Sequence, residues 1–80
     1  MPRAKNRPAQ PNESLISGLD LLQALAGAPG PVGSREMARL LDMEHTRVNR
    51  LMGTLAHMGL AEKTADRKYA PGPGLHVLAA

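Results

Sequence analysis

The sequence contains no cysteine, tryptophan or phenylalanine, and its single aromatic residue is Tyr69. Without cysteine the chain can form neither the disulfide bonds nor the zinc clusters that stabilise many small domains. The lack of cysteine also fits a reducing cytosol, so we expect a cytoplasmic location. No apolar run approaches the ~20 residues of a membrane-spanning helix, and no apolar segment follows the basic N-terminus. We therefore expect neither a membrane protein nor a secretory signal.

The chain is short for an independent fold. Its 80 residues make one domain, and a domain near this size buries only about 60% of the surface that its unfolded chain exposes. Stability must therefore come from helix packing, and we expect a partner chain to add to it.

Positive charge is concentrated at the N-terminus. The formal net charge is +3, and the first segment, residues 1–12, contains Arg3, Lys5 and Arg7 but no acidic residue. In the rest of the chain, seven basic and seven acidic residues cancel. The first segment is also rich in proline, asparagine and glutamine, which predicts a flexible basic arm over residues 1–13.

The first predicted helix begins after Ser14 as N-cap and runs to about Ala26, with Gly27 as a left-handed stop. Its apolar stripe consists of Leu15, Leu19, Leu22 and Ala26, widened by Leu21, Leu25 and Ile16. This arc of about 220° is wider than the stripe of a surface helix. The helix is therefore either sunk in the domain or shared between its own core and a second subunit. We favour the second interpretation and expect a homodimer formed through residues 15–26.

The second predicted helix follows a connector rich in glycine and proline. Ser34 is its expected N-cap, and the helix extends from Arg35 to Leu41. The side chains expected to face inward are Met37, Leu40 and Leu41. In the connector, Val32 is a candidate for a short strand.

A longer third helix follows the turn at Asp42-Met43. It is predicted from about Glu44 to Met58, and Gly59 ends it in the left-handed conformation with Leu60 folded back. A short helix, a turn of about three or four residues and a longer helix are typical of the helix-turn-helix motif.

The remaining chain predicts a short hairpin and the start of another helix. Residues 60–64 and 68–70 are candidate strands around a polar turn at Ala65-Asp66-Arg67. Strand propensity is poor in both, so an irregular loop is the alternative. Residues 75–80 are apolar again and resemble the beginning of a helix whose packing partner lies elsewhere.

The third helix has two different faces. Its buried face is expected to consist of Val48, Leu51, Met52, Leu55 and Met58. The opposite face has no acidic residue and carries Thr46, Asn49, Arg50, Gly53 and His57, with Arg47 at its edge. Arginine can bridge O6 and N7 of guanine, and asparagine can pair with adenine through two hydrogen bonds. Gly53, which costs about 1 kcal/mol relative to alanine, would let the helix lie close to a groove wall. This face therefore predicts readout of DNA bases.

Each candidate contact also has an alternative interpretation. An exposed polar helix face is most often simply solvated, and the neighbouring short helix and basic hairpin favour DNA binding here. In the hairpin, Arg67 and Lys68 either contact phosphates or form a solvated turn. In the arm, Arg3, Lys5 and Arg7 form either a solubilising tail or additional contacts in the minor groove.

Four segments of the chain match a family pattern. They are Gly18-Leu-Asp-Leu-Leu-Gln-Ala-Leu25, Ser34-Arg-Glu-Met-Ala-Arg-Leu-Leu41, Thr46-Arg-Val-Asn-Arg-Leu-Met52 and Tyr69-Ala-Pro-Gly72, with Leu55, Gly59 and Leu75. In these segments residues 15–78 resemble the N-terminal domain of the IclR family of bacterial transcription regulators. The chain departs from the family pattern at Asp42, Glu44 and Asn49, where the family usually has glycine, proline, and an aromatic residue or histidine.

The resemblance implies a mainly α fold, a three-helix winged helix-turn-helix domain with a short two-stranded wing. It also implies a dimer that reads a near-palindromic operator, and a larger C-terminal domain that senses a small-molecule effector. We therefore divide the chain into the arm at residues 1–13, the DNA-binding domain at 14–74 and the start of a linker helix at 75–80. On this interpretation the sequence is a fragment of a longer regulator.

The predicted function is sequence-specific binding of double-stranded DNA, with residues 44–58 in the major groove and the wing on the phosphate backbone. The candidate DNA-contacting residues are Ser34, Arg35, His45, Thr46, Arg47, Asn49, Arg50, Gly53, Arg67, Lys68 and, in the arm, Arg3, Lys5 and Arg7. The alternatives are a MarR-like or other winged-helix regulator, and a winged helix that binds proteins. No catalytic, cofactor or metal site is predicted, because the three histidines are scattered and no acid–base pair is fixed by spacing.

Overall fold

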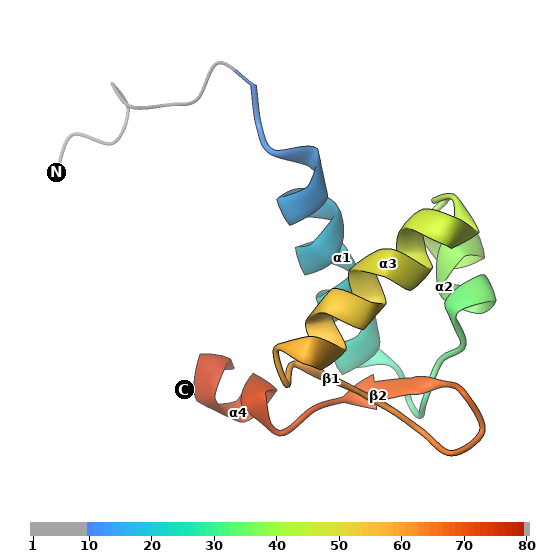
Figure 1. Ribbon diagram of the computed structural model, residues 1–80, viewed down its shortest axis with the longest axis vertical. Helices are drawn as coiled ribbons and strands as arrows, with labels where there is room; N and C mark the ends of the chain where they lie inside the picture. The colour runs from blue at the N-terminus through green and yellow to red at the C-terminus, as the bar shows by residue number, and fades with distance from the viewer. Residues whose placement is uncertain (1–9, 80) are drawn as a thin grey trace, which may run out of the picture.

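The computed structural model describes residues 10–79, in which three helices precede a two-stranded antiparallel hairpin and a short fourth helix (Figure 1). The elements are α1 (Glu13–Gly27), α2 (Ser34–Leu40), α3 (His45–His57), β1 (Ala61–Lys63), β2 (Tyr69–Pro71) and α4 (Gly74–Ala79). The predicted winged helix-turn-helix architecture, including the hairpin, is confirmed. The arm residues Arg3, Lys5 and Arg7 lie outside the described residues.

Helix α1 begins and ends differently from the prediction. Its N-cap is Asn12, whose side-chain oxygen accepts a hydrogen bond from the N–H of Leu15 at 2.9 Å. Asparagine is at least as good a cap as serine, so the earlier residue takes this position and the predicted cap at Ser14 is wrong. Gly27 is the last helical residue rather than a left-handed stop, because the chain leaves the helix in an extended conformation at Ala28.

The apolar arc of α1 is divided between the core and the surface. Leu21, Leu22 and Leu25 are buried. Leu15 and Leu19 are 62% and 50% exposed, although both were placed on the same stripe as Leu22. The helix is therefore not sunk in the domain, and one side of it has no cover from the described part of this chain.

Helix α2 is capped by Gly33 and not by Ser34, whose side chain makes no capping hydrogen bond. Met37 and Ala38 are its buried residues. The prediction for Leu40 is wrong, since this side chain is 63% exposed. The inward direction lies between Met37 and Ala38, and Leu40 points about 110° away from it.

Helix α3 packs its apolar side against α1 and α2. Val48, Met52 and Leu55 are buried as predicted. Met58 is 61% exposed, contrary to prediction, because the helix has already ended and this residue lies at the edge of a cleft beside α1.

The end of α3 confirms the predicted left-handed glycine. Gly59 has φ +80°, and its N–H donates to the carbonyl oxygen of Ala56 at 3.0 Å. The N–H of Leu60 donates to the carbonyl oxygen of Leu55 at 2.9 Å. These two bonds form a Schellman motif, which satisfies the last carbonyl groups and turns the chain toward β1.

The hairpin is attached to the helical body through its second strand. Lys63 pairs with Tyr69, and Val32 forms an isolated bridge with Tyr69 through two backbone hydrogen bonds of 2.8 Å. Val32 therefore pairs as an isolated bridge, and the predicted short strand is reduced to this one residue. The buried ring of Tyr69 and the side chain of Ala61 join the same core as α1, α2 and α3. Gly72 allows the end of the hairpin to pass against α3, because a Cβ there would collide with the carbonyl oxygen of Gly59.

Across residues 10–79, no helix combines the length and the apolar character needed to cross a bilayer.

Candidate nucleic-acid interface

The polar face of α3 is open to solvent. Helix α3 lies at the front of the molecule in Figure 1, and every residue predicted for its outer face is exposed. These residues are Thr46, Asn49, Arg50, Gly53 and His57. The helix itself contains no acidic residue, and the nearest one along the chain is its N-cap, Glu44. A surface of amide, hydroxyl, guanidinium and imidazole groups on a rigid helix can donate hydrogen bonds to base edges and phosphates.

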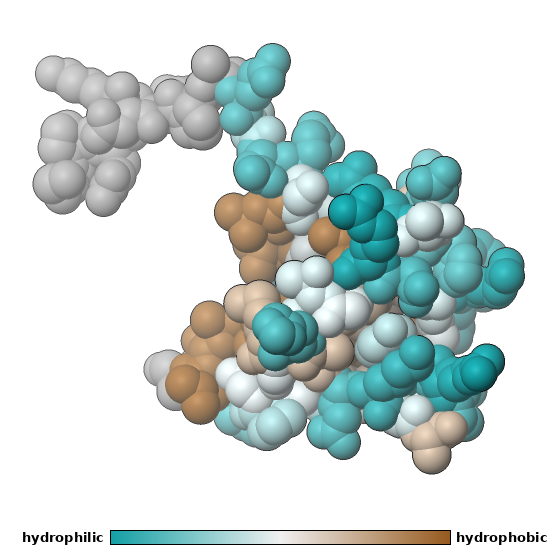
Figure 2. Space-filling model, in the orientation of Figure 1, coloured by the Kyte–Doolittle hydropathy of each residue, from teal (hydrophilic) through white to brown (hydrophobic). Residues whose placement is uncertain are grey.

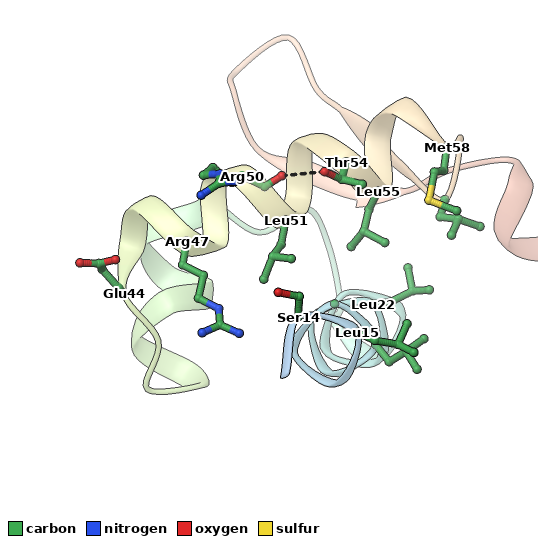
Figure 3. Close-up of a pocket in the computed structure, with 13 residues that line it drawn as sticks. Ser14, Leu15, Leu22, Glu44, Arg47, Arg50, Leu51, Thr54, Leu55 and Met58 are labelled. Atoms are coloured by element: carbon green, nitrogen blue, oxygen red, sulfur yellow. Dashed lines mark hydrogen bonds between the residues drawn. The ribbon is translucent and has the colours of Figure 1, made fainter. Parts of the chain in front are cut away.

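The two arginines of α3 face different surroundings. In Figure 3, Arg50 extends away from α1, whereas Arg47 points toward it. One Nη atom of Arg47 donates to Oγ of Ser17 on α1 at 3.1 Å. Arg47 is therefore partly committed to holding α3 against α1, while Arg50 is exposed.

Nothing in the fold requires a glycine at position 53. A Cβ built on Gly53 would meet no atom within 4 Å, and its φ is not in the left-handed region. The position is exposed in the middle of a helix where glycine is unfavourable. The presence of glycine at position 53 would be explained if another molecule approaches α3 closely there.

Ser34 and His45 are brought together across the helix-turn-helix. Oγ of Ser34 and Nε2 of His45 are 2.8 Å apart, and both residues are half-buried. Both were predicted as DNA-contacting residues, and their contact with each other was not predicted. Their hydrogen bond ties the first residue of α2 to the first residue of α3, whereas the neighbouring Arg35 is exposed.

The hairpin presents more positive charge than predicted. Arg67 and Lys68 are exposed in its turn, and Arg67 has φ +65°. Lys63 also belongs to this surface, with its Nζ 5.8 Å from the centre of the Tyr69 ring. The pairing of Lys63 with Tyr69 across the strands could have been deduced from the hairpin register. These three cations share the exposed wing surface with the acidic residues Glu62 and Asp66.

One acidic residue, Asp66, lies between these cations. Its side chain accepts a hydrogen bond from the hydroxyl of Thr64. This bond is the main cause of a lowered pKa of the Asp66 carboxyl; desolvation opposes it, and the backbone and the charge of Lys68 add smaller lowering effects. Neither Thr64 nor Asp66 was among the predicted site residues.

An open cleft of about 720 Å³ separates α1 from α3 (Figure 3). Its walls are mainly apolar and include Leu15 and Leu19 from α1, and Leu51 and Met58 from the side of α3. Figure 2 shows hydrophobic surface over the first half of α1 and over α4, on the side of the molecule away from the wing. The cleft also reaches Arg47 and Arg50 of α3, so the apolar surface borders the polar face of this helix.

Within residues 10–79, no group of three or more histidine, aspartate or glutamate residues could hold a metal ion.

Comparison with known proteins gives a consistent family pattern. The sequence model of the IclR helix-turn-helix domain matches residues 14–65. The structure of an IclR family transcriptional regulator from Brucella abortus superposes with a TM-score of 0.81 at 22% identity, over 98% of this chain and 30% of that one. Thermotoga maritima IclR gives a TM-score of 0.76 at 25% identity, over 81% of this chain and 26% of that one. No curated protein matches the sequence.

The same fold also occurs in a protein of another kind. A structure described as a pericyclic reaction enzyme superposes with a TM-score of 0.68 at 25% identity, over 82% of this chain and 18% of that one. In each comparison, the chain spans less than a third of the longer protein that it matches.

Proposed function

Since this chain belongs to the family of IclR helix-turn-helix domains, we propose that it binds double-stranded DNA with sequence specificity as the DNA-binding domain of a bacterial transcription regulator. In this proposal α3 enters the major groove and the wing lies on the adjacent phosphates. The observation that carries it is the exposed face of α3, which has no acidic residue. The MarR-like alternative is set aside by the family match.

The proposed base contacts come from the middle of this face. Arg50 and Asn49 are exposed one after the other, and their side chains are suited to guanine and adenine respectively. Thr46 and His57 extend the contact surface along the helix. Arg47 and His45 already have hydrogen-bond partners within the domain. We therefore propose no base contact for them, and place them near phosphates at the edge of the DNA contact surface. Ser34 and Arg35 would meet the backbone from α2.

The alternative of a protein-binding winged helix makes a different demand on α3. Interaction surfaces are rich in aromatic and aliphatic anchors, and the exposed face of α3 has neither. The match to an enzyme structure shows that the fold alone does not decide activity. The proposal assigns this domain no catalytic step, because its support comes from the chemistry of α3.

Two further parts of the proposal concern the rest of a regulator. The exposed leucines of α1 support a homodimer, whose two copies would read the halves of a near-palindromic operator. Helix α4 would begin a linker toward a C-terminal domain that binds a small-molecule effector. The arm residues Arg3, Lys5 and Arg7 lie outside the described residues, and their contact with the minor groove stays a prediction.

Substitution of Arg50 tests the proposal directly. A tightly bound duplex is first selected from a random DNA pool, and binding is then measured by fluorescence anisotropy. Arg50→Ala should weaken binding to that duplex by about 1–3 kcal/mol and relax its sequence preference, because a bidentate base contact is lost. Arg39→Ala is the matched control, since Arg39 is an exposed arginine at the end of α2 outside the proposed footprint. Equal binding by wild type and Arg50→Ala would count decisively against α3 as the reading helix.

A further inference from the structure

The turn of the wing is organised around one side chain, Thr64. Its Oγ1 accepts a hydrogen bond from the N–H of Lys68 at 3.0 Å, and its own N–H donates to the carbonyl oxygen of Lys68 at 2.8 Å. Its carbonyl oxygen accepts from the N–H of Arg67 at 3.1 Å. Thr64 therefore contacts both residues that return the chain toward β2, and it closes a three-residue loop with Arg67 in the left-handed conformation.

The hydroxyl proton of Thr64 has two acceptors within reach. One is the carboxylate of Asp66 and the other is the carbonyl oxygen of Lys68, which is 3.2 Å away. A hydroxyl donates only one proton, and an ionised carboxylate is the stronger acceptor. The proton therefore goes to Asp66. This agrees with the lowered pKa of the Asp66 carboxyl, for which this hydrogen bond is the first cause.

The position of Asp66 matters because of what surrounds it. It is an exposed carboxylate next to Arg67 in a loop that also carries Lys68. On a phosphate backbone an unrestrained carboxylate would be repelled and would offset part of the attraction of its neighbours. The hydrogen bond from Thr64 restrains this carboxylate against its own loop.

From this geometry we propose, on the basis of the DNA-binding function above, that Thr64 is the positioning residue of the wing. Its hydroxyl fixes the loop backbone through Lys68 and restrains the carboxylate of Asp66, while Arg67 and Lys68 stay available for phosphate. Thr64 itself needs no contact with DNA.

The hydrogen bond can be tested without DNA. In the full chain, the carboxyl of Asp66 is titrated by NMR in wild type and in Thr64→Val, which keeps the shape of the side chain and removes the hydroxyl. The wild-type pKa should be lower than usual for aspartate and should rise in Thr64→Val, whereas Thr64→Ser should keep it low. Because the folded value is the lower one, this bond contributes stability above about pH 4 and loses it as the pH falls further. An identical titration in wild type and Thr64→Val would overturn the inference.

The consequence for binding is measured by anisotropy on the selected duplex and on a random one. Thr64→Val should weaken binding to both duplexes about fivefold, the effect of losing one or two hydrogen bonds that order the loop. Thr64→Ser should bind within about twofold of wild type, because its hydroxyl can make the same bonds. Asp66→Asn should bind at least as tightly as wild type, since the amide can still accept from Thr64 and the charge is gone.

The double variant Thr64→Val/Asp66→Asn separates the two parts of the inference. It should recover part of the loss, because no carboxylate is left to repel phosphate. Wild-type affinity in Thr64→Val would overturn the positioning role, and a double variant as weak as Thr64→Val would overturn the role of the carboxylate. Failure of the wild-type chain to bind either duplex would instead contradict the proposed function, and the carboxyl titration would still decide the hydrogen bond.

Discussion

At the scale of single residues, substitution of Gly53 should affect the stability of the fold and DNA binding in opposite directions. The free protein has room for a side chain at this exposed position. Gly53→Ala should therefore raise stability by about 1 kcal/mol, because alanine favours the helix. It should also weaken DNA binding, since the added methyl group meets the groove wall. Thermal unfolding and anisotropy measure the two effects, and a variant that is both more stable and equally tight would remove Gly53 from the interface.

Arg67 presents a similar conflict within the wing. An arginine at φ +65° is held in a conformation that costs about 1–2 kcal/mol relative to glycine. Its occurrence there is explained if the position is needed for its charge. Arg67→Gly should therefore stabilise the domain, yet reduce the dependence of log K on log salt by about 0.9 and weaken binding to all sequences alike. Arg67→Lys is the control that retains the charge, and an unchanged slope in Arg67→Gly would exclude Arg67 from the phosphate contacts.

At the scale of elements, α1 is the proposed contact between two copies of the domain. Leu19 is half exposed, whereas Leu22 one turn later is buried. Leu19→Glu should disrupt the dimer and lower operator affinity about a hundredfold, because the two half-sites are then bound independently. Leu40→Glu is the matched control, with an exposed leucine on α2.

Sedimentation of the protein alone and with operator DNA would measure this effect. Two copies per operator are expected for wild type and Leu40→Glu, and one or none for Leu19→Glu. Wild type that remains a monomer at high concentration and on the operator would contradict the dimer.

The elements also show which features a sequence can predict. The end of α3 was predictable because a glycine such as Gly59 is a local signal for the end of a helix. The exposed face of α3 was predictable because the periodicity of its apolar residues is clear. The exposure of Leu40 and Met58 was not, since the seven residues of α2 define its inward direction poorly and periodicity does not say where α3 ends. The choice of Asn12 over Ser14 as the cap of α1 was likewise missed, because both residue types are favoured caps and a local rule does not rank them.

The candidate site was only partly predictable for the same reason. The exposure of Asn49 and Arg50 could be predicted from the periodicity of α3 alone. The hydrogen bond between Ser34 and His45 joins residues on two helices, and the one between Thr64 and Asp66 depends on the shape of a loop. Such pairs require tertiary geometry that no spacing rule supplies.

At the scale of the whole molecule, the proposed DNA-binding face of α3 borders the apolar cleft along Arg50, while the hydrophobic surface over α1 and α4 lies away from the wing (Figure 2). The outer face of α3 and the wing carry polar and cationic groups, whereas Leu15 and Leu19, the exposed leucines of α1, line the cleft. Two copies joined through α1 can therefore both direct α3 toward one duplex. Their reading helices should then lie about 34–36 Å apart, one turn of DNA.

The double backbone bridge between Val32 and Tyr69 has a mechanical consequence. It fastens the root of the wing to the connector between α1 and α2, so the hairpin cannot swing as a flap about its base. Farther out, between Lys63 and Tyr69, the loop is closed by the hydrogen bonds of Thr64 with Arg67 and Lys68. The wing is thus held both at its base and at its tip, and we expect it to meet a duplex at a fixed angle to α3.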